Sequence, residues 1–389
     1  MTPVRRTATR PGVAGLSTPP QLPEEPMPTL ERFWTSTAEP PTQFVTPDGQ
    51  LTELGAAYGV QPALAQMLYR DMARARRLDQ EALALQRQGE LGLWLQCWGQ
   101  EAAQVGSIRA LAPTDHVFPS YREHAAAMVR GVTPGELLAQ WRGVTHAGWD
   151  PTSYNFHFYS LVLGTQTLHA TGYAMGSVLD GDDQVVAAYF GDGASSQGDV
   201  NEALNWSAAG NLPVLFVCQN NQWAISTPID LQFRTPVHQR AAGFGLRVFH
   251  VDGNDALATY AVTREAAALV RRGEGPALIE AETFRMAGHS TSDDPARYRT
   301  ADELRTWQAR DPLTRLEVLL RGLGTATEFF SDLDEELEAL AAEIRRVCRE
   351  LPEPVPGDLF THAYAGPHAL VEAGRLAHRE LVDLMAEEA

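Results

Sequence analysis

Hydrophobic positions recur along this chain with two different spacings, which predict alternating strands and helices. Unbroken apolar runs at residues 185–190 and 213–218 have the length and composition of buried strands. Between them, residues 199–209 place apolar side chains at helical spacing and stop at Gly210. A strand, a helix and a second strand in this order predict a βαβ unit, whose two parallel strands end at the same edge of a sheet.

The same two spacings predict most of the remaining structure. Further βα units are expected up to about residue 283, including a strand at residues 277–282. Three longer amphipathic helices are predicted at residues 62–88, 331–350 and 368–388. We expect Ser331 to cap the second of them, and Pro367 suits the start of the third. The predicted fold class is α/β, a parallel sheet flanked by helices, with extra helices at both ends.

The first part of the chain differs from the rest in composition. Residues 1–47 carry ten of the 25 prolines and show little apolar periodicity, so we expect an extended or disordered N-terminal arm. Residues 48–389 are then expected to form one α/β domain with a C-terminal helical extension. The hydrophobic fraction of 44% suffices for a substantial core in a domain of this size.

Composition and charge argue against several classes of function. The net charge of −18 disfavours non-specific binding to nucleic acid, and no run of eighteen apolar residues is present to span a membrane. Cys97, Cys218 and Cys348 show neither metal-binding nor disulfide spacing, which fits the reducing cytoplasm. All 31 basic residues are arginine, so Schiff-base enzymes, pyridoxal enzymes and Walker A nucleotide sites, which need a lysine, are excluded.

Candidate chemistry follows the two strands of the predicted βαβ unit. Gly191-Asp192-Gly193 comes after one strand and Asn220-Asn221 after the other, so Asp192 and Asn221 should meet at the sheet edge. A carboxylate and an amide oxygen suit Mg²⁺, which takes its remaining ligands from phosphates and water. The glycines permit close approach of a bulky anion, and the helix start that follows favours negative charge. A lone Gly-Asp-Gly would be an ordinary turn, but two such strand ends predict a site for Mg²⁺ and a diphosphate.

These motifs resemble those of a known family. Gly191-Asp192-Gly193 followed by Asn220-Asn221 is similar to the thiamine diphosphate motif, and the surrounding sequence resembles the α subunit of the E1 component of 2-oxoacid dehydrogenase complexes. The resemblance extends from about residue 45 to about residue 350. Its further segments follow the family's order at residues 85–89, 99–103, 118–123, 164–167 and 288–294. The resemblance implies a thiamine diphosphate-binding fold.

The resemblance also implies roles for individual residues. Asp192, Asn221 and the main-chain oxygen of Trp223 would bind Mg²⁺. Taken alone, Arg122 would be interpreted as part of a surface ion pair, and Leu161 and Leu163 as core residues. The positions that match the family's diphosphate or aminopyrimidine contacts are Tyr121, Arg122, Leu161, Leu163, Gly191, Asp192, Gly193, Ala194, Asn221 and His289.

His289 is the residue that we expect to act in catalysis. It follows the strand predicted at residues 277–282, in a polar segment where an imidazole can donate to a phosphate or a substrate carboxylate and titrate near neutrality. The neighbouring Ser290 matches a phosphorylation position of eukaryotic members, although a serine in a loop does not by itself imply regulation.

Other positions match the family's pattern only in part. Ser160, Thr165 and Gln166 match a potassium site of some members, and capping of a helix start explains them equally well. Gln219 stands where several members have an arginine that pairs with the diphosphate, so one charged contact is lost. Trp223 replaces a more usual tyrosine or phenylalanine, which a main-chain ligand tolerates.

The resemblance implies oxidative decarboxylation of a 2-oxoacid and transfer of the acyl group to a lipoyl group of an E2 partner. In two-chain members a glutamate of the β subunit activates the cofactor. This chain offers no candidate for that glutamate, so an α₂β₂ heterotetramer is expected. Branched-chain 2-oxoacids are the favoured substrates and pyruvate comes next. An acetoin dehydrogenase α subunit and a non-catalytic scaffold of the same fold are the alternatives. A Rossmann nucleotide-binding protein is disfavoured, because this chain lacks the Gly-x-Gly-x-x-Gly turn of that fold.

Overall fold

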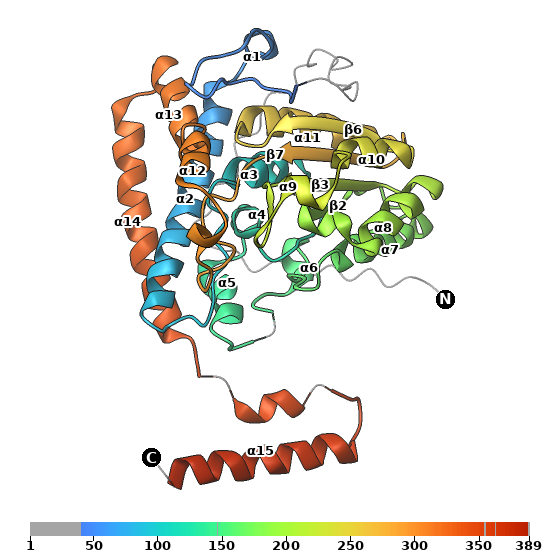
Figure 1. Ribbon diagram of the computed structural model, residues 1–389, viewed down its shortest axis with the longest axis vertical. Helices are drawn as coiled ribbons and strands as arrows, with labels where there is room; N and C mark the ends of the chain where they lie inside the picture. Colours follow the sequence, from blue (N-terminus) through green and yellow to red (C-terminus); the bar gives the residue numbers. More distant parts are fainter. Residues whose placement is uncertain (1–39, 146, 354, 362, 388–389) are drawn as a thin grey trace.

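A five-stranded parallel sheet forms the centre of the fold in a computed structural model, which describes residues 40–145, 147–353, 355–361 and 363–387 (Figure 1). The strand order is β1-β2-β3-β7-β6, and every neighbouring pair is parallel. The strands are β1 His116–Phe118, β2 Val186–Gly191, β3 Val214–Asn220, β6 Arg247–Asp252 and β7 Ala277–Glu282. The α/β class and the parallel sheet predicted from the sequence are confirmed.

Helices cover both faces of the sheet because its central strands are apolar on both sides. Val186, Ala188 and Phe190 of β2 belong to one core, whereas Ala187 and Tyr189 belong to the other, as the alternation of a strand requires. The first core packs under α7 Thr165–Asp180, α8 Gly198–Ala209 and α10 Val237–Gly243. The second packs under α2 Pro62–Arg87, α3 Glu101–Ala110 and α11 Ala256–Arg271.

Shorter elements complete the body around these layers. Those before α7 are α1 Glu53–Tyr58, α4 His124–Val129, α5 Pro134–Trp141 and α6 Pro151–Tyr154. After β3 come the small hairpin β4 Trp223–Ala224 with β5 Thr227–Pro228, and then α9 Ile229–Gln232. After β7 come α12 Ala301–Gln308, α13 Pro312–Gly322 and α14 Thr327–Glu350, the last of which packs along α2 (Figure 1).

The predicted start of α14 is wrong by one turn. The helix begins at Thr327, and Ser331 lies inside it instead of capping it, with its hydroxyl donating to a main-chain carbonyl of the same helix. Phe330, in the added turn, packs edge-on against Tyr69 of α2 with ring centroids 5.8 Å apart. This tertiary contact extends the helix beyond the point where a serine cap was expected. The helix predicted at residues 62–88, by contrast, is confirmed as α2.

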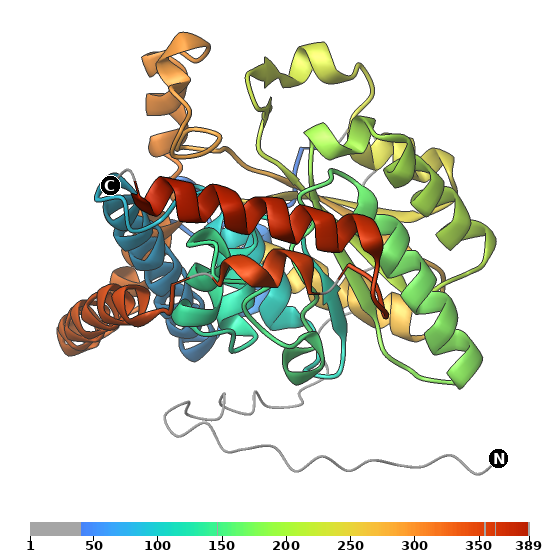
Figure 2. The same ribbon diagram turned by 90° about the horizontal axis from the view of Figure 1, so that it is seen from below.

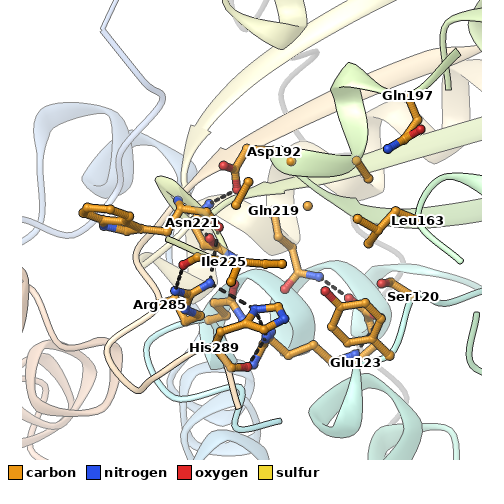
Figure 3. A pocket seen from close by; sticks show the side chains of 18 residues that line it. Ser120, Glu123, Leu163, Asp192, Gln197, Gln219, Asn221, Ile225, Arg285 and His289 are labelled. Carbon is orange, nitrogen blue, oxygen red and sulfur yellow. Dashed lines mark hydrogen bonds between the residues drawn. The ribbon is translucent and has the colours of Figure 1, made fainter. Parts of the chain in front are cut away.

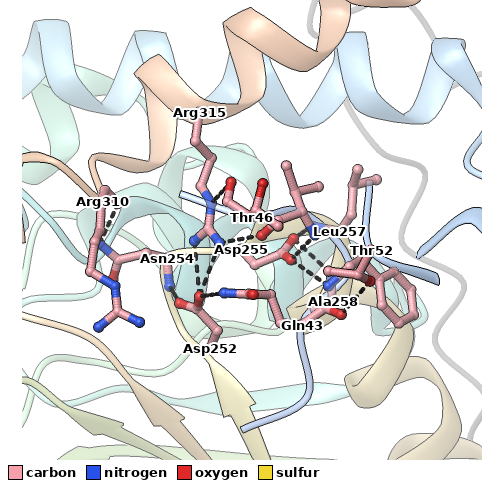
Figure 4. A network of polar contacts seen from close by, with 12 residues as sticks. Gln43, Thr46, Thr52, Asp252, Asn254, Asp255, Leu257, Ala258, Arg310 and Arg315 are labelled. Atoms are coloured by element: carbon pink, nitrogen blue, oxygen red, sulfur yellow. Dashed lines mark hydrogen bonds and ion pairs between the residues drawn. The ribbon is translucent and has the colours of Figure 1, made fainter. Parts of the chain in front are cut away.

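The last eight residues of the predicted arm, 40–47, lie within the described part of the chain and run along the end of β6. The main-chain amides of Phe44 and Val45 both donate to Asp255 Oδ2 at 2.7 Å, and Phe44 is fully buried. The buried Arg315 of α13 donates to Asp252 and to the main-chain oxygen of Val45 (Figure 4). Residues 1–39 of the predicted arm lie outside the described residues.

The C-terminal helix, α15 Ala369–Glu387, lies apart from this body (Figures 1 and 2). Its principal contact is with the short helix η4 Pro356–Phe360, and none of its residues is buried. It confirms the helix predicted at residues 368–388, of which Glu388 lies outside the described residues. In the part of the chain that the structure describes, no helix is long and apolar enough to cross a membrane.

Candidate active site

The carboxyl ends of β2 and β3 meet where the sequence predicts. In the register of the two strands Gly191 is opposite Gln219, so the residues that follow each strand lie side by side. Asp192 is fully buried, and its Oδ1 accepts a hydrogen bond from the main-chain amide of Asn221 at 3.1 Å (Figure 3). Burial raises the pKa of Asp192, so a cation beside its carboxylate would stabilise the charged form.

A glycine is required directly after Asp192. A Cβ atom on Gly193 would lie 2.7 Å from the Cβ of Ala224, well inside van der Waals contact. The close packing brings the loop after β3 against the turn after β2. The missing side chain of Gly193 therefore allows these two segments to pack closely, in addition to permitting close approach of an anion.

A cavity of about 240 Å³ opens at this sheet edge. Leu161, which the resemblance placed at the aminopyrimidine, is 59% exposed and outside the cavity wall. The remaining predicted cofactor and metal residues line it together: Tyr121, Arg122, Leu163, Gly191, Asp192, Gly193, Ala194, Asn221, Trp223 and His289 (Figure 3).

One side of the cavity presents oxygen atoms. The main-chain amide of Trp223 donates to Asn221 Oδ1 at 3.2 Å, which identifies this atom as the amide oxygen and leaves it a further lone pair. The Asp192 carboxylate and the main-chain oxygen of Trp223 complete the predicted set. Among the described residues no cluster of three or more His, Cys, Asp or Glu could hold a metal. A single carboxylate with amide and carbonyl oxygens fits Mg²⁺ that is shared with a phosphate.

Two arginines also line the cavity. Arg122 donates to the main-chain oxygens of Gln96 at 2.7 Å and His289 at 2.8 Å instead of to a carboxylate, so it is not the surface ion pair of the alternative interpretation. Arg285 is 1% exposed and donates to the main-chain oxygens of Ile225 at 2.6 Å and Trp223 at 3.3 Å. Burial and the nearby Arg122 lower the pKa of Arg285 to about 10. Two guanidinium groups in a buried wall favour an anion in the cavity.

The protonation state of His289 follows from these neighbours. Its Nδ1 lies 3.4 Å from Arg122 Nη2 and 3.3 Å from Arg285 Nη1, and guanidinium groups can only donate. Nδ1 is therefore the acceptor, and the proton is on Nε2. Burial and the two arginines lower the pKa of His289 to about 3, so the expectation that it titrates near neutrality is wrong. The residue offers a neutral N–H donor instead of an imidazolium.

Gln219, at the position where an arginine was noted as more usual, belongs to a buried hydrogen-bond network. Its Nε2 donates to Glu123 Oε1 at 2.6 Å, and its Oε1 accepts from Gln104 Nε2 at 3.0 Å. Burial raises the pKa of Glu123 to about 6. Glu123 and Arg285 also line the cavity. Neither was predicted from the sequence as a site residue, because their burial depends on elements far apart in the chain.

The residues that match a potassium site lie just beyond the cavity. Gln166 Nε2 donates to the main-chain oxygen of Tyr189 at 2.9 Å, and its buried Oε1 has no partner among the described residues. Ser160 Oγ donates to the main-chain oxygen of Val162 at 3.0 Å. Thr165 is the first residue of α7. The N-cap residue is its neighbour Gly164, so no side chain caps this end of the helix.

Comparisons with known proteins agree with this geometry. A family model described as dehydrogenase E1 component matches residues 69–358. The 3-methyl-2-oxobutanoate dehydrogenase subunit alpha of Mycobacterium tuberculosis is 42% identical over 342 residues, which cover 87% of this chain and 92% of that protein. The mitochondrial 2-oxoisovalerate dehydrogenase subunit alpha 2 of Arabidopsis thaliana is 35% identical, with 86% and 74% covered. The pyruvate dehydrogenase E1 component subunit alpha of Staphylococcus aureus is 38% identical, with 72% and 75% covered.

Proposed function

The chain belongs to the dehydrogenase E1 component family, and from this premise we propose that it is the α subunit of a branched-chain 2-oxoacid dehydrogenase that uses thiamine diphosphate and Mg²⁺. The observation that carries the proposal is the set of groups that line the cavity. Oxygen ligands at the ends of β2 and β3 and two buried arginines lie in the same lining. A magnesium diphosphate has the matching distribution of charge.

The oxygen ligands, the arginines and His289 each have a role in the proposed reaction. Asp192, Asn221 Oδ1 and the main-chain oxygen of Trp223 would hold Mg²⁺, and Arg122 would neutralise the diphosphate. Bound thiamine diphosphate supplies the carbon nucleophile and the electron sink for decarboxylation. His289 would donate its Nε2–H to a diphosphate oxygen or to the carboxylate of the 2-oxoacid. Leu163, in the cavity wall, would help to exclude water from the reacting carbon.

A β subunit would complete the site. Asp192 and Glu123 are the only carboxylates among the described residues that line the cavity, and both already accept hydrogen bonds from neighbouring side chains. An uncommitted glutamate for cofactor activation would therefore come from a partner. Large apolar side chains are exposed around the mouth, namely Leu161, Val162, Ile225 and Leu231, and such a surface suits a permanent interface. We propose an α₂β₂ assembly in the cytoplasm that passes the acyl group to a lipoylated E2.

A bound potassium ion is part of the proposal. Within the described part of the chain the buried Oε1 of Gln166 is an acceptor without a partner, and a cation that it shared with Ser160 and Thr165 would satisfy it. Such an ion would stiffen the start of α7 and the segment that carries Leu163.

The preference for branched-chain substrates rests on the relatives. The chain shares 42% identity with the 3-methyl-2-oxobutanoate dehydrogenase subunit and 38% with the pyruvate dehydrogenase subunit. Because a difference of one methylene is worth only about 1–3 kcal/mol in a pocket, the two substrates must be compared directly.

The proposal is tested by decarboxylation with the chain and its β partner in the presence of thiamine diphosphate and Mg²⁺. We expect kcat/KM for 3-methyl-2-oxobutanoate to exceed that for pyruvate by about 10-fold or more. A preference for pyruvate would correct the substrate class. The absence of turnover with either acid by a well-formed complex would contradict the proposed activity and favour acetoin or a scaffold role.

A further inference from the structure

Gln100 lies behind the metal-ligand loop and has no role in the function proposed so far. It immediately precedes α3, is 1% exposed and lines the cavity. Its Oε1 accepts a hydrogen bond from Asn221 Nδ2 at 2.7 Å. Its Nε2 is buried and has no partner in the described part of the chain. The contact with Asn221 is therefore the one hydrogen bond of the Gln100 side chain among the described residues.

The backbone around Gln100 is fixed from three sides. Gly99 has a φ of +94°, and a Cβ atom there would lie 2.2 Å from the main-chain oxygen of Phe284. The Gly99 amide donates to Glu101 Oε2 at 2.8 Å, and the Gly99 carbonyl accepts from Thr283 Oγ1 at 2.8 Å. Glu101 is itself fully buried and paired with Arg76. These contacts fix the backbone from which the Gln100 side chain extends.

The hydrogen bonds around Asn221 allow only one orientation of its amide. The main-chain amide of Trp223 must meet an acceptor, so the Oδ1 of Asn221 points toward it and Nδ2 points toward Gln100. Rotating the Asn221 amide by 180° would set two donors against each other at Trp223 and two acceptors against each other at Gln100. Trp223 and Gln100 together therefore hold the Asn221 amide in one orientation, with its Oδ1 toward the main chain of Trp223 and its Nδ2 toward Gln100.

We propose that Gln100 is a positioning residue for the metal site, which holds the Oδ1 of Asn221 ready for Mg²⁺. The inference rests on the proposed function, since it assumes that Asn221 is a metal ligand. Groups that orient a ligand from behind are worth about 10–100-fold in metal affinity. Without Gln100 only the Trp223 amide would orient the Asn221 side chain, and a rotated amide would present a nitrogen, which cannot bind a cation.

The test compares two substitutions of similar size in the complex of the full chain with its β subunit. Gln100→Leu removes the acceptor, whereas Gln100→Glu keeps an acceptor at the same reach, replaces the unpartnered donor by a second oxygen and can add a negative charge. Mg²⁺ is titrated at a fixed concentration of thiamine diphosphate, and cofactor binding is followed by calorimetry. Thermal unfolding without Mg²⁺ checks that each variant is folded, and Gln100→Ala replaces the leucine variant if that one does not assemble.

We expect Gln100→Leu to need about 10–100-fold more Mg²⁺ for half-saturation, with turnover restored when Mg²⁺ is saturating. Gln100→Glu should need no more Mg²⁺ than the wild type, because it keeps the acceptor and an added negative charge favours a cation. An unchanged Mg²⁺ requirement in Gln100→Leu would overturn the inference, and so would an equal loss in both variants. If instead the wild-type complex binds no cofactor, the proposed function itself is contradicted.

Discussion

Asp79 of α2 is a buried acid whose protonation should change the stability of the whole protein. It is 1% exposed, and its Oδ1 accepts from the indole nitrogen of Trp94 at 2.8 Å. Burial raises the pKa of this carboxyl to about 7 from its ordinary value of 3.8. Between these two pH values the folded state keeps a proton that the unfolded chain releases. The contribution of Asp79 to stability is therefore present at low pH and is lost as pH rises to about 7.

Asp79→Asn should remove this dependence on pH, because an amide can still accept from Trp94 but cannot ionise. We expect the free energy of unfolding of the variant, relative to the wild type, to rise by about 1–3 kcal/mol between pH 5 and pH 8. Urea unfolding at both pH values measures it, with the exposed Asp332→Asn as the control for the loss of one charge. A constant difference between variant and wild type would show that Asp79 is ionised throughout.

At the scale of single residues, the sequence predicted the groups that follow strand ends. Asp192 and Asn221 were found because parallel strands end at one edge of a sheet, so their proximity follows from local pattern alone. Gln100 and Arg285 were missed because they reach the cavity from elements distant in sequence. The low pKa of His289 was missed for the same reason, since it depends on two arginines that only the fold places beside it.

At the scale of elements, one buried ion pair helps to attach the N-terminal segment. Arg315 of α13 and Asp252 at the end of β6 are 1% and 2% exposed, with Arg315 Nη2 3.0 Å from Asp252 Oδ2 (Figure 4). The same guanidinium donates to the main-chain oxygens of Val45 and Thr46. One side chain thus joins α13, the sheet and residues 40–52.

Arg315→Met should leave Asp252 buried without its partner. We expect a loss of about 3–5 kcal/mol in the free energy of unfolding, measured with chemical denaturant at pH 7. The matched control is Arg346→Met on α14, which breaks only an exposed pair with Glu350 and should cost less than about 0.5 kcal/mol. Equal effects of the two substitutions would mean that the buried pair contributes nothing beyond an ordinary surface contact.

Element boundaries show how far local pattern can be trusted. The strand predicted at residues 277–282 matches β7, in which the buried Glu280 interrupts the apolar run and accepts hydrogen bonds from Asn220 and His238. The packing of residues 40–47 could not be predicted, since proline content suggested an arm and the hydrogen bonds to Asp255 come from over 200 residues away.

At the scale of the whole molecule, α15 leaves apolar side chains exposed that the described chain does not cover. Its apolar residues are exposed, with Leu370 at 78% and Leu384 at 61%. The sequence predicted this helix from its amphipathic spacing, but an amphipathic pattern does not say which partner the apolar face meets. Together with the apolar mouth of the cavity, α15 is expected to pack against another subunit.

Replacing two leucines of α15, in the double variant Leu381→Gln and Leu384→Gln, should weaken association with the β subunit by at least about tenfold. The fold of the chain itself should be unchanged, because neither side chain is buried in it. Sedimentation velocity over a range of concentrations measures the effect, with the exposed Glu380→Gln on the same helix as the control. Unaltered association would show that this face of α15 is not part of the interface.

The most direct test of the account is the binding of thiamine diphosphate to the complex of this chain with its β subunit, measured by calorimetry with and without Mg²⁺. We expect binding only when Mg²⁺ is present, and a loss of at least about 100-fold in affinity for Asp192→Ala, since a direct ligand should matter at least as much as the groups behind it. The thermal unfolding of Asp192→Ala without cofactor should confirm that it is folded. Binding that does not need Mg²⁺, or that Asp192→Ala leaves unchanged, would contradict the assignment of this cavity as the cofactor site.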